Sequence, residues 1–349
     1  MSNWQFTAAD VPPLRVVAIG GGTGLSTILR GLKRYVAHAS GEPTEFGFTI
    51  SQLSAIVTVT DDGGSSGRLR KEMGVPPPGD IRNCMVALAE DEALLSRLFQ
   101  YRFSEGEGLE GHNFGNLFLT ALARITGDFS EAVKLSSAIL ASRGDIFPAT
   151  NADVRLYAEM HDGSHVRGET NITASKKRIV KLSLVPANAK PLPQTLQAIA
   201  EADLITIGPG SLFTSLVPNL LVRQVPEAIA ASKAVKAYVC NIMTQANESL
   251  DLTAADHIRA LFTHARQKVF DYALINRAPV PQILRDKYAE EGASPIVPDL
   301  EAVQALGVQP ILGDYLDQSG LARHDSDRIA QDLLSLAARI RQGATPVCL

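Results

Sequence analysis

Between Val16 and Tyr35 the sequence reads VVAIGGGTGLSTILRGLKRY. The apolar run from Val16 to Ile19 ends at three consecutive glycines, and a segment of helical period follows. A strand that passes through a glycine loop into a helix leaves backbone N–H groups free at the helix N-terminus, where anions bind. The stretch therefore predicts an α/β fold with an anion site directly after its first strand.

Short apolar runs alternate with helical segments along most of the chain. The runs are LRVVAIG from Leu14, LSAIVTVTDD from Leu53, DLITIGPGS from Asp203, KAYVCNIMTQ from Lys236 and DYALINR from Asp271. Helical period spans residues 26–38, 81–100, 116–125, 130–141, 226–233, 254–264 and 325–341. Near-continuous apolar strands are typical of parallel sheets covered on both faces, with right-handed connections. We predict a three-layer, Rossmann-like, doubly wound α/β fold with a mainly parallel sheet.

One region breaks this alternation. Between residues 145 and 185, strand-like runs of alternating apolar and polar residues flank the turn signal HDGS at His161. No Pro-, Gly- or Ser-rich linker divides the chain. We therefore predict a single nucleotide-binding domain over residues 14–341, a small β-rich insertion at 145–185, and loose termini at 1–13 and 342–349.

Composition excludes several classes of protein. The net charge is −4 and no basic block stands out, which argues against a nucleic-acid partner. The three cysteines lie far apart, as in a reducing compartment. The N-terminus does not resemble a signal peptide, and no apolar stretch is long enough for a membrane span. We expect a cytoplasmic protein.

Four loops at predicted strand ends carry the candidate ligand-binding residues, because ligands of open α/β sheets bind at that edge. The first contains Gly21, Gly22, Thr23 and Gly24. It is neither a strict G-x-G-x-x-G nor a P-loop, since no Gly-Lys-Ser/Thr follows. Its amides and hydroxyls suit a diphosphate; a purely structural glycine turn is the alternative.

The second loop joins two carboxylates to a run of small residues. Its candidates are Asp61, Asp62, Ser65 and Arg68. A carboxylate after the second strand can take ribose hydroxyls, and a carboxylate pair beside phosphates can hold Mg²⁺. A long Asx-type turn with a helix cap is the structural alternative.

The remaining candidates flank helix starts and later strands. In the third loop, Asp80 resembles an N-cap, and Arg82 and Asn83 lie in the first helical turn, where they can face the same cleft. His112, Asn113 and Asn116 suit either a base- or sugar-binding edge or simple caps. The fourth loop again follows a buried strand with a glycine- and hydroxyl-rich turn, and the next strand ends close by. The candidates there are Gly208, Gly210, Ser211, Leu212, Asn241 and Thr244.

These loops together resemble the YvcK/CofD family, and within it the YvcK branch of gluconeogenesis factors. The matching blocks are GGGTGLS, TVTDDGGSSGRLR, PPPGDIRNC, FGNLFLTAL, ADLITIGPGSLFTSL and VCNIMTQ, with ADHI and RHD nearer the C-terminus. They follow in the same order from about Gly20 to about Asp325. QANESLD at Gln245 departs from the Pro-Gly-Glu-Thr type of loop that is usual in the branch.

The resemblance implies a Rossmann-like fold, often dimeric, that binds nucleotide-sugars such as UDP-N-acetylglucosamine. It implies links to carbon metabolism, cell shape and wall synthesis. By motif, phosphate contacts fall on Gly21, Gly22, Thr23, Gly210 and Ser211, while Asp61 and Asp62 lie by the nucleotide or its metal. Arg323, in RHD, helps to hold the nucleotide-sugar. The related CofD branch transfers a phospholactyl group from a nucleotide diphosphate donor, with magnesium.

Three functions stay open at this point. The leading hypothesis is a nucleotide-sugar-binding regulatory protein with no turnover of its own, no required cofactor, a homodimeric state and a regulatory protein partner. The alternative is a magnesium-dependent transferase of the 2-phospholactate type. A dinucleotide-dependent oxidoreductase is the third, weakened by the imperfect glycine fingerprint.

Overall fold

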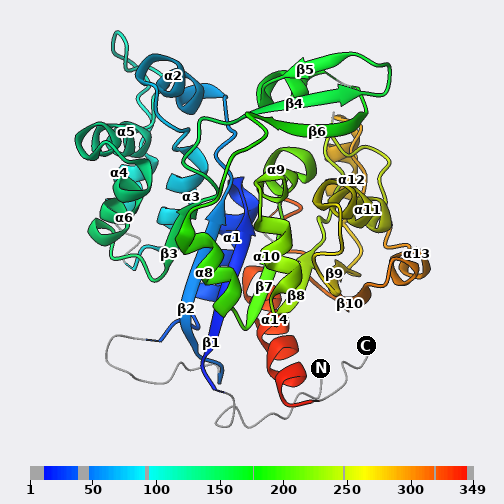
Figure 1. Cartoon of the computed structure of the whole chain (residues 1–349). Helices are drawn as coiled ribbons and strands as arrows, with labels where there is room; N and C mark the ends of the chain where they lie inside the picture. Colours follow the sequence, from blue (N-terminus) through cyan, green and yellow to red (C-terminus); the bar gives the residue numbers. More distant parts are fainter. Residues whose placement is uncertain are drawn as a thin grey trace.

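The structure is a computed structural model that describes residues 12–37, 47–90, 94–175, 177–246, 248–317 and 320–343. Its centre is a seven-stranded parallel sheet in the order β10-β9-β8-β7-β1-β2-β3 (Figure 1). β1 lies between β2 and β7 and is buried at every position except Arg15, which explains its unbroken apolar sequence. The strands are β1 (Leu14–Gly20), β2 (Ile50–Val57), β3 (Asp145–Pro148), β7 (Leu204–Ile207), β8 (Val235–Val239), β9 (Tyr272–Asn276) and β10 (Gln309–Gly313).

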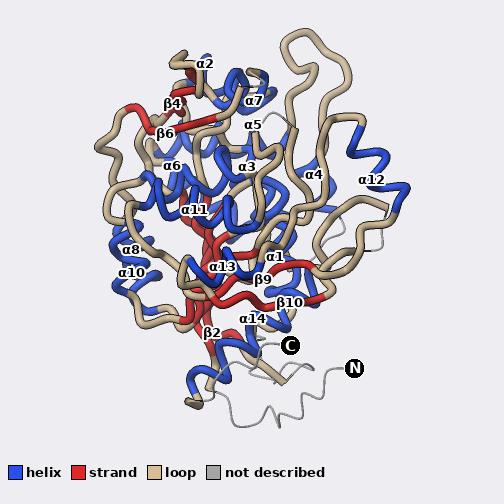
Figure 2. Tube along the Cα trace, turned by 90° about the vertical axis from the view of Figure 1, so that its right-hand side faces the viewer, coloured by secondary structure: helices blue, strands red, loops and turns tan. Residues whose placement is uncertain are grey.

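Helices cover both faces of the sheet, so the predicted three-layer fold is confirmed. One face carries α1 (Gly22–Lys33), α3 (Gly79–Leu88) and α14 (Ser326–Arg341), and α1 contacts the other two. The other carries α8 (Pro193–Glu201), α9 (Val217–Leu221), α10 (Val225–Ala231) and α11 (Ala254–Ala265). Figure 2 shows the two layers on either side of the strands. In α1, Leu25, Ile28, Leu29 and Leu32 form one fully buried stripe, the spacing of a helix packed on a sheet.

Most of the other helices lie beside the two edges of the sheet. α2 (Gly64–Met73), α4 (Leu94–Gln100), α5 (Phe114–Thr126) and α6 (Phe129–Ile139) gather beside β2 and β3 (Figure 1). α12 (Gln282–Ala289) and α13 (Leu300–Ala305) follow β9 on the opposite side.

Several elements differ from the sequence-based expectations. β3 and β10 are not predicted as strands of the main sheet; both are its edge strands and are only partly buried, which weakens their apolar pattern. The single helix predicted over 81–100 is two helices, α3 and α4. Residues 64–73, predicted as a loop, form α2, whose serines and glycines have low intrinsic helix propensity.

The region 145–185 contains the small β-rich unit and one element of the main sheet. β4 (Arg155–Met160), β5 (His165–Arg167) and β6 (Ile179–Val185) form an antiparallel sheet in the order β5-β4-β6, and α7 (Glu169–Ala174) follows β5. Asp145–Pro148 instead pairs in parallel with β2 as β3. The antiparallel unit therefore begins at Arg155, ten residues after the predicted start of the insertion.

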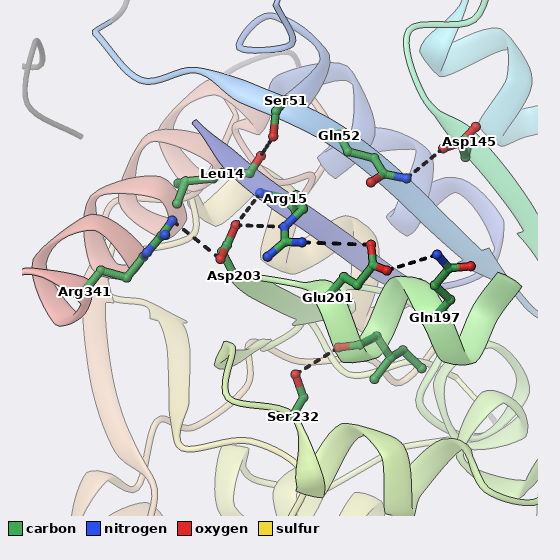
Figure 3. Close-up of polar contacts among 11 residues, drawn as sticks. Leu14, Arg15, Ser51, Gln52, Asp145, Gln197, Glu201, Asp203, Ser232 and Arg341 are labelled. Atoms are coloured by element: carbon green, nitrogen blue, oxygen red, sulfur yellow. Dashed lines mark hydrogen bonds and ion pairs between the residues drawn. The ribbon is translucent and has the colours of Figure 1, made fainter. Parts of the chain in front are cut away.

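Polar contacts fasten the amino ends of the central strands (Figure 3). Asp203 accepts a hydrogen bond from the Arg15 backbone N–H at 2.8 Å, and its other oxygen lies 3.5 Å from the Arg341 guanidinium of α14. The Gln52 amide of β2 donates to Asp145 of β3 at 3.2 Å. These contacts join β1 to α14 through the residue before β7, and β2 to β3, at the amino end of the sheet. The opposite, carboxyl end is left to the loops.

The predicted loose termini fall mostly outside the described residues, which begin at Pro12 and end at Gly343. No helix in the described part of the chain has the length and apolar character that crossing a membrane requires. Cys84 and Cys240 are free, buried thiols.

Candidate functional site

A cleft of about 680 Å³ opens at the carboxyl ends of β1 and β7. The chain leaves β1 toward β2 on one side, while β7 pairs on the other, so this is the point where the strand order reverses. Open α/β sheets bind ligands at such switch points. We refer to this cavity as the central cleft.

The glycine loop forms one wall of the central cleft. Gly22 has φ +61°, which favours glycine, and begins α1. A Cβ on Gly24 would lie 2.4 Å from the Pro209 carbonyl oxygen, so the backbones of the two loops touch. Thr23 is exposed and lines the cleft. The Ser26 hydroxyl instead donates to the Gly22 carbonyl at 3.0 Å, which directs it away from a ligand.

The loop after β7 presents fewer free amides than its sequence suggests. The Gly210 N–H donates to the Asn241 side-chain oxygen at 3.2 Å. The N–H groups of Phe213 and Thr214 both donate to the Glu248 carboxylate, at 2.6 and 2.9 Å. What this loop offers the cleft is the Ser211 hydroxyl, which accepts a hydrogen bond from Gln245.

The two adjacent aspartates have separate surroundings. Both oxygens of Asp62 accept hydrogen bonds at the start of α7, from the backbone N–H groups of Glu169 and Thr170 and from the Thr170 hydroxyl, at 2.7–3.0 Å. Asp62 thus fastens the antiparallel unit to the main domain. Asp61 accepts from the Gly63 N–H at 2.9 Å. Neither lines the central cleft.

Two other carboxyl groups do reach the cleft. Asp80 lies in the first turn of α3 and accepts a hydrogen bond from the Gly22 N–H, so it faces the glycine loop rather than capping its own helix. Burial, and then the charge of Asp61, raise the pKa of Asp80 to about 7. Burial, followed by the charges of Asp61 and Asp80, raises the pKa of Glu169 to about 9. The acids at the cleft wall are therefore less negative at neutral pH than isolated carboxylates.

Four arginines line the same cleft: Arg30, Arg82, Arg102 and Arg323. Arg82 donates to the side-chain oxygens of Asn83 and Asn116, at 2.6 and 3.2 Å, which fixes its guanidinium. Burial lowers its pKa, although guanidinium remains charged in proteins. Four cations against two partly protonated carboxyl groups give the cleft a net positive lining.

The polar cluster before α5 is mainly structural. Asn113 is the N-cap of α5 and accepts from the Asn116 N–H at 3.2 Å. His112 is buried, and its Nδ1 lies 3.0 Å from the Ser65 hydroxyl. Arg68 donates to the Glu110 carbonyl at 2.7 Å. Of this group only Asn113 lines the cleft.

The structure thus brings many, but not all, of the predicted site residues together. Those that line the central cleft are Gly21, Gly22, Thr23, Gly24, Asn83, Asn113, Gly210, Ser211, Asn241, Thr244 and Arg323. Those that do not are Asp61, Asp62, Ser65, Arg68, His112, Asn116, Gly208 and Leu212. Arg82 and Gln245, which the sequence also indicates as facing the cleft, line it too. Among the lining residues that the sequence did not indicate are Arg30, Arg102, Glu169 and Tyr288. Nothing local marks Glu169 or Tyr288.

The carboxylate side chains near the cleft also bear on the predicted magnesium site. Among the described residues, no three of His, Cys, Asp and Glu are placed to hold a metal ion together. Asp62 does not fit the role, because both of its oxygens cap α7. Asp80 offers a carboxylate oxygen at Gly21 of the glycine loop, and Asp61 offers one beside Gly79, at the start of α3. Mg²⁺ commonly takes one or two protein carboxylates and completes its shell with phosphate and water.

Comparison with known proteins agrees with the fold. The family model described as 2-phospho-L-lactate transferase CofD matches residues 16–316. A protein of Nostoc named putative gluconeogenesis factor is 51% identical over 92% of this chain and 68% of its own length. The gluconeogenesis factor of Bacillus subtilis is 46% identical over 92% of this chain and 98% of its own. A crystal structure of a UPF0052 family member from Bacillus halodurans superposes with a TM-score of 0.86 at 44% identity, covering 92% of this chain and 99% of that one.

Proposed function

The chain belongs to the CofD family, and on that premise we propose that it binds a nucleotide-sugar of the UDP-N-acetylglucosamine kind as a regulatory protein. The observation that carries the proposal is the meeting, in one cleft, of a glycine loop at a helix N-terminus and four arginines. Backbone amides at a helix start and guanidinium groups are donors that recognise a diphosphate.

The volume and the lining residues of the cleft suit a nucleotide-sugar. The cleft volume of about 680 Å³ is within the range of small-molecule sites. Thr23 and Ser211 face it from the two loops, where they can hydrogen-bond the diphosphate, and Arg323 approaches from the segment before α14. The remaining polar lining, Asn83, Asn113 and Gln245, suits the hydroxyl and amide groups of a sugar.

The regulatory role draws on the relatives. Several are named gluconeogenesis factors, which supports a link to central carbon metabolism. We propose that occupancy of the cleft by a nucleotide-sugar reports the supply of cell-wall precursor and thereby acts on cell shape and wall synthesis. In this account the protein is a homodimer and passes the signal to a protein partner.

The proposal is tested by a thermal-shift panel with UDP-N-acetylglucosamine, UDP and N-acetylglucosamine 1-phosphate. A ligand at 100 times its Kd stabilises a folded protein by about 2.7 kcal/mol. We expect a rise in Tm of several degrees with the full nucleotide-sugar and a smaller one with either half. No shift with any nucleotide at millimolar concentration would refute the proposal.

The alternative function is a magnesium-dependent transferase acting on a nucleotide diphosphate donor. It is favoured by the description of the matching family model and by the carboxyl groups of Asp80, at the glycine loop, and Asp61, at the start of α3. In that role they would hold Mg²⁺, which neutralises charge on a departing phosphate. Product formed from donor and acceptor by the wild type, and lost in Asp61→Asn, would establish this function instead.

A further inference from the structure

A second, smaller cavity of about 210 Å³ adjoins the central cleft. Asn241 and Ile242, at the end of β8, line both. The side pocket, as we call it, lies between the ends of β8 and β9 and the loops on either side of α12. A molecule whose phosphates lie at the glycine loop can therefore extend past Asn241 into the side pocket.

Seven of the ten residues that line the side pocket are apolar. Ile242, Ile275, Val280 and Ile296 are each less than 9% exposed and face it with two prolines. Ile242 and Val280 also belong to a small hydrophobic cluster with Leu284 that is separate from the main core. The result is a preformed apolar recess, such as binds the faces of a flat ring.

Of the three polar side chains that line the side pocket, two are held by hydrogen bonds to the described residues and one is not. Asn241 is engaged through both amide atoms with Gly210, and Asn276 is engaged with the backbone of Ala278 and Tyr315. Arg285, on α12, lines the pocket and is exposed. Within the described residues it makes no hydrogen bond or ion pair, so its guanidinium is available to a ligand. Arginine only donates hydrogen bonds.

We propose that the side pocket receives the nucleobase of the ligand and that Arg285 recognises a carbonyl oxygen on the edge of that base. This inference rests on the proposed nucleotide-sugar function and specifies its nucleotide. A base with ring carbonyl groups, uracil or guanine, presents such an acceptor, while adenine presents none. The protein should therefore prefer UDP- or GDP-linked ligands to ADP-linked ones.

The test uses the full chain and calorimetric titration with UDP-N-acetylglucosamine, ADP-glucose and inorganic pyrophosphate. Arg285→Ala removes the donor, and Ala278→Leu narrows the pocket from a partly exposed loop position. Ile283→Ala, on the same helix but 78% exposed and outside both cavities, is the matched control. Tm measurements establish that each variant is folded.

We expect Arg285→Ala to weaken binding of UDP-N-acetylglucosamine about tenfold or more, since a hydrogen bond from a charged donor contributes about 1.5–3 kcal/mol. Ala278→Leu should weaken it as well. Pyrophosphate affinity should change less than about twofold in both variants, and Ile283→Ala should bind like the wild type. The wild type should bind ADP-glucose more weakly, and Arg285→Ala should lose that preference.

Two results would overturn the inference. Unchanged binding of UDP-N-acetylglucosamine in both variants, or a parallel loss of pyrophosphate in Arg285→Ala, would remove the base site and leave the proposed function standing. A wild type that binds pyrophosphate but no nucleotide would refute the proposed function and the base site together.

Discussion

Gly24 lies where the backbones of two strand-end loops meet. Its Cα packs against the Pro209 carbonyl, and any side chain there must displace one loop. We expect Gly24→Ala to reduce stability by about 1–3 kcal/mol, the cost of overpacking a close contact, and to abolish nucleotide-sugar binding. Urea unfolding and calorimetry measure the two effects.

Gly74→Ala is the control for this substitution. Gly74, unlike Gly24, has a positive φ, and open space surrounds it at the end of α2. It should lose some stability and keep binding. Normal affinity in Gly24→Ala would contradict the role given to the contact between the loops.

Asp80 links the stability of the fold to pH. Its pKa is about 7 in the folded protein, against 3.8 as a reference, so between these values the folded state binds more protons than the unfolded chain. The contribution of Asp80 to the free energy of unfolding is therefore fully present below pH 3.8 and is lost as the pH rises through 7. Asp80→Asn keeps an acceptor for the Gly22 N–H without the charge. We expect the variant to gain about 1–3 kcal/mol relative to the wild type at pH 8 and much less at pH 5, since one pKa unit corresponds to about 1.4 kcal/mol.

The measurement is urea unfolding of both proteins between pH 5 and 8. Asp286→Asn, an exposed carboxylate on α12, controls for a general effect of net charge. Profiles that run parallel for Asp80→Asn and the wild type would show that this carboxyl group does not carry the pH dependence.

Local sequence indicates the backbone of the site better than its side chains. The glycine loop and Arg323 were predicted and lie in the central cleft. The assignment of Asp61 and Asp62 to that cleft's lining does not match the structure, because a carboxylate after a strand serves equally as a cap, and only tertiary contact with Thr170 decides between the two roles. Glu169 could not be predicted, since it enters the cleft from a distant unit.

At the scale of elements, α7 depends on a cap from outside its own segment. Asp62 supplies three hydrogen bonds to its first turn. We expect Asp62→Ala to lower stability by about 1–2 kcal/mol, the usual cost of a lost N-cap. It should also raise amide hydrogen exchange within residues 155–185 more than in the central sheet, as the antiparallel unit loosens.

Asp128→Ala provides the comparison for this prediction. Asp128 is the N-cap residue of α6, and the hydrogen bonds of its side chain go to α6 and to Asn151, outside residues 155–185. It should cost a similar amount of stability without changing exchange in 155–185. Equal exchange in Asp62→Ala and the wild type would show that the unit is held by other contacts.

The elements predicted from sequence are those with strong apolar patterns. The central strands β1, β2, β7, β8 and β9 were all predicted, because burial on both faces makes them continuously apolar. The edge strands β3 and β10 lack that pattern. α2 was missed because Ser65, Ser66 and Gly67 favour loops, and Gly67 is required there by its approach to the Asp62 carbonyl.

For the whole molecule, the sheet's topology accounts for the location of the site. The strand order reverses beside β1, which brings loops separated by nearly 190 residues to the two sides of one cleft. The sequence predicted this doubly wound arrangement from alternation alone. It could not supply the strand order or the presence of Arg30 and Arg102 in the cleft, since these depend on which segments pack beside β1.

The measurement that tests the account most directly is calorimetric titration of the protein with UDP-N-acetylglucosamine, with magnesium present, for the wild type, Thr23→Ala and Arg323→Ala. We predict saturable binding by the wild type, and a loss of affinity of about tenfold in each variant, the effect of removing one hydrogen bond or ion pair to a diphosphate. Absence of saturable heat in the wild type, or unchanged affinity in both variants, would contradict a nucleotide-sugar site between these loops.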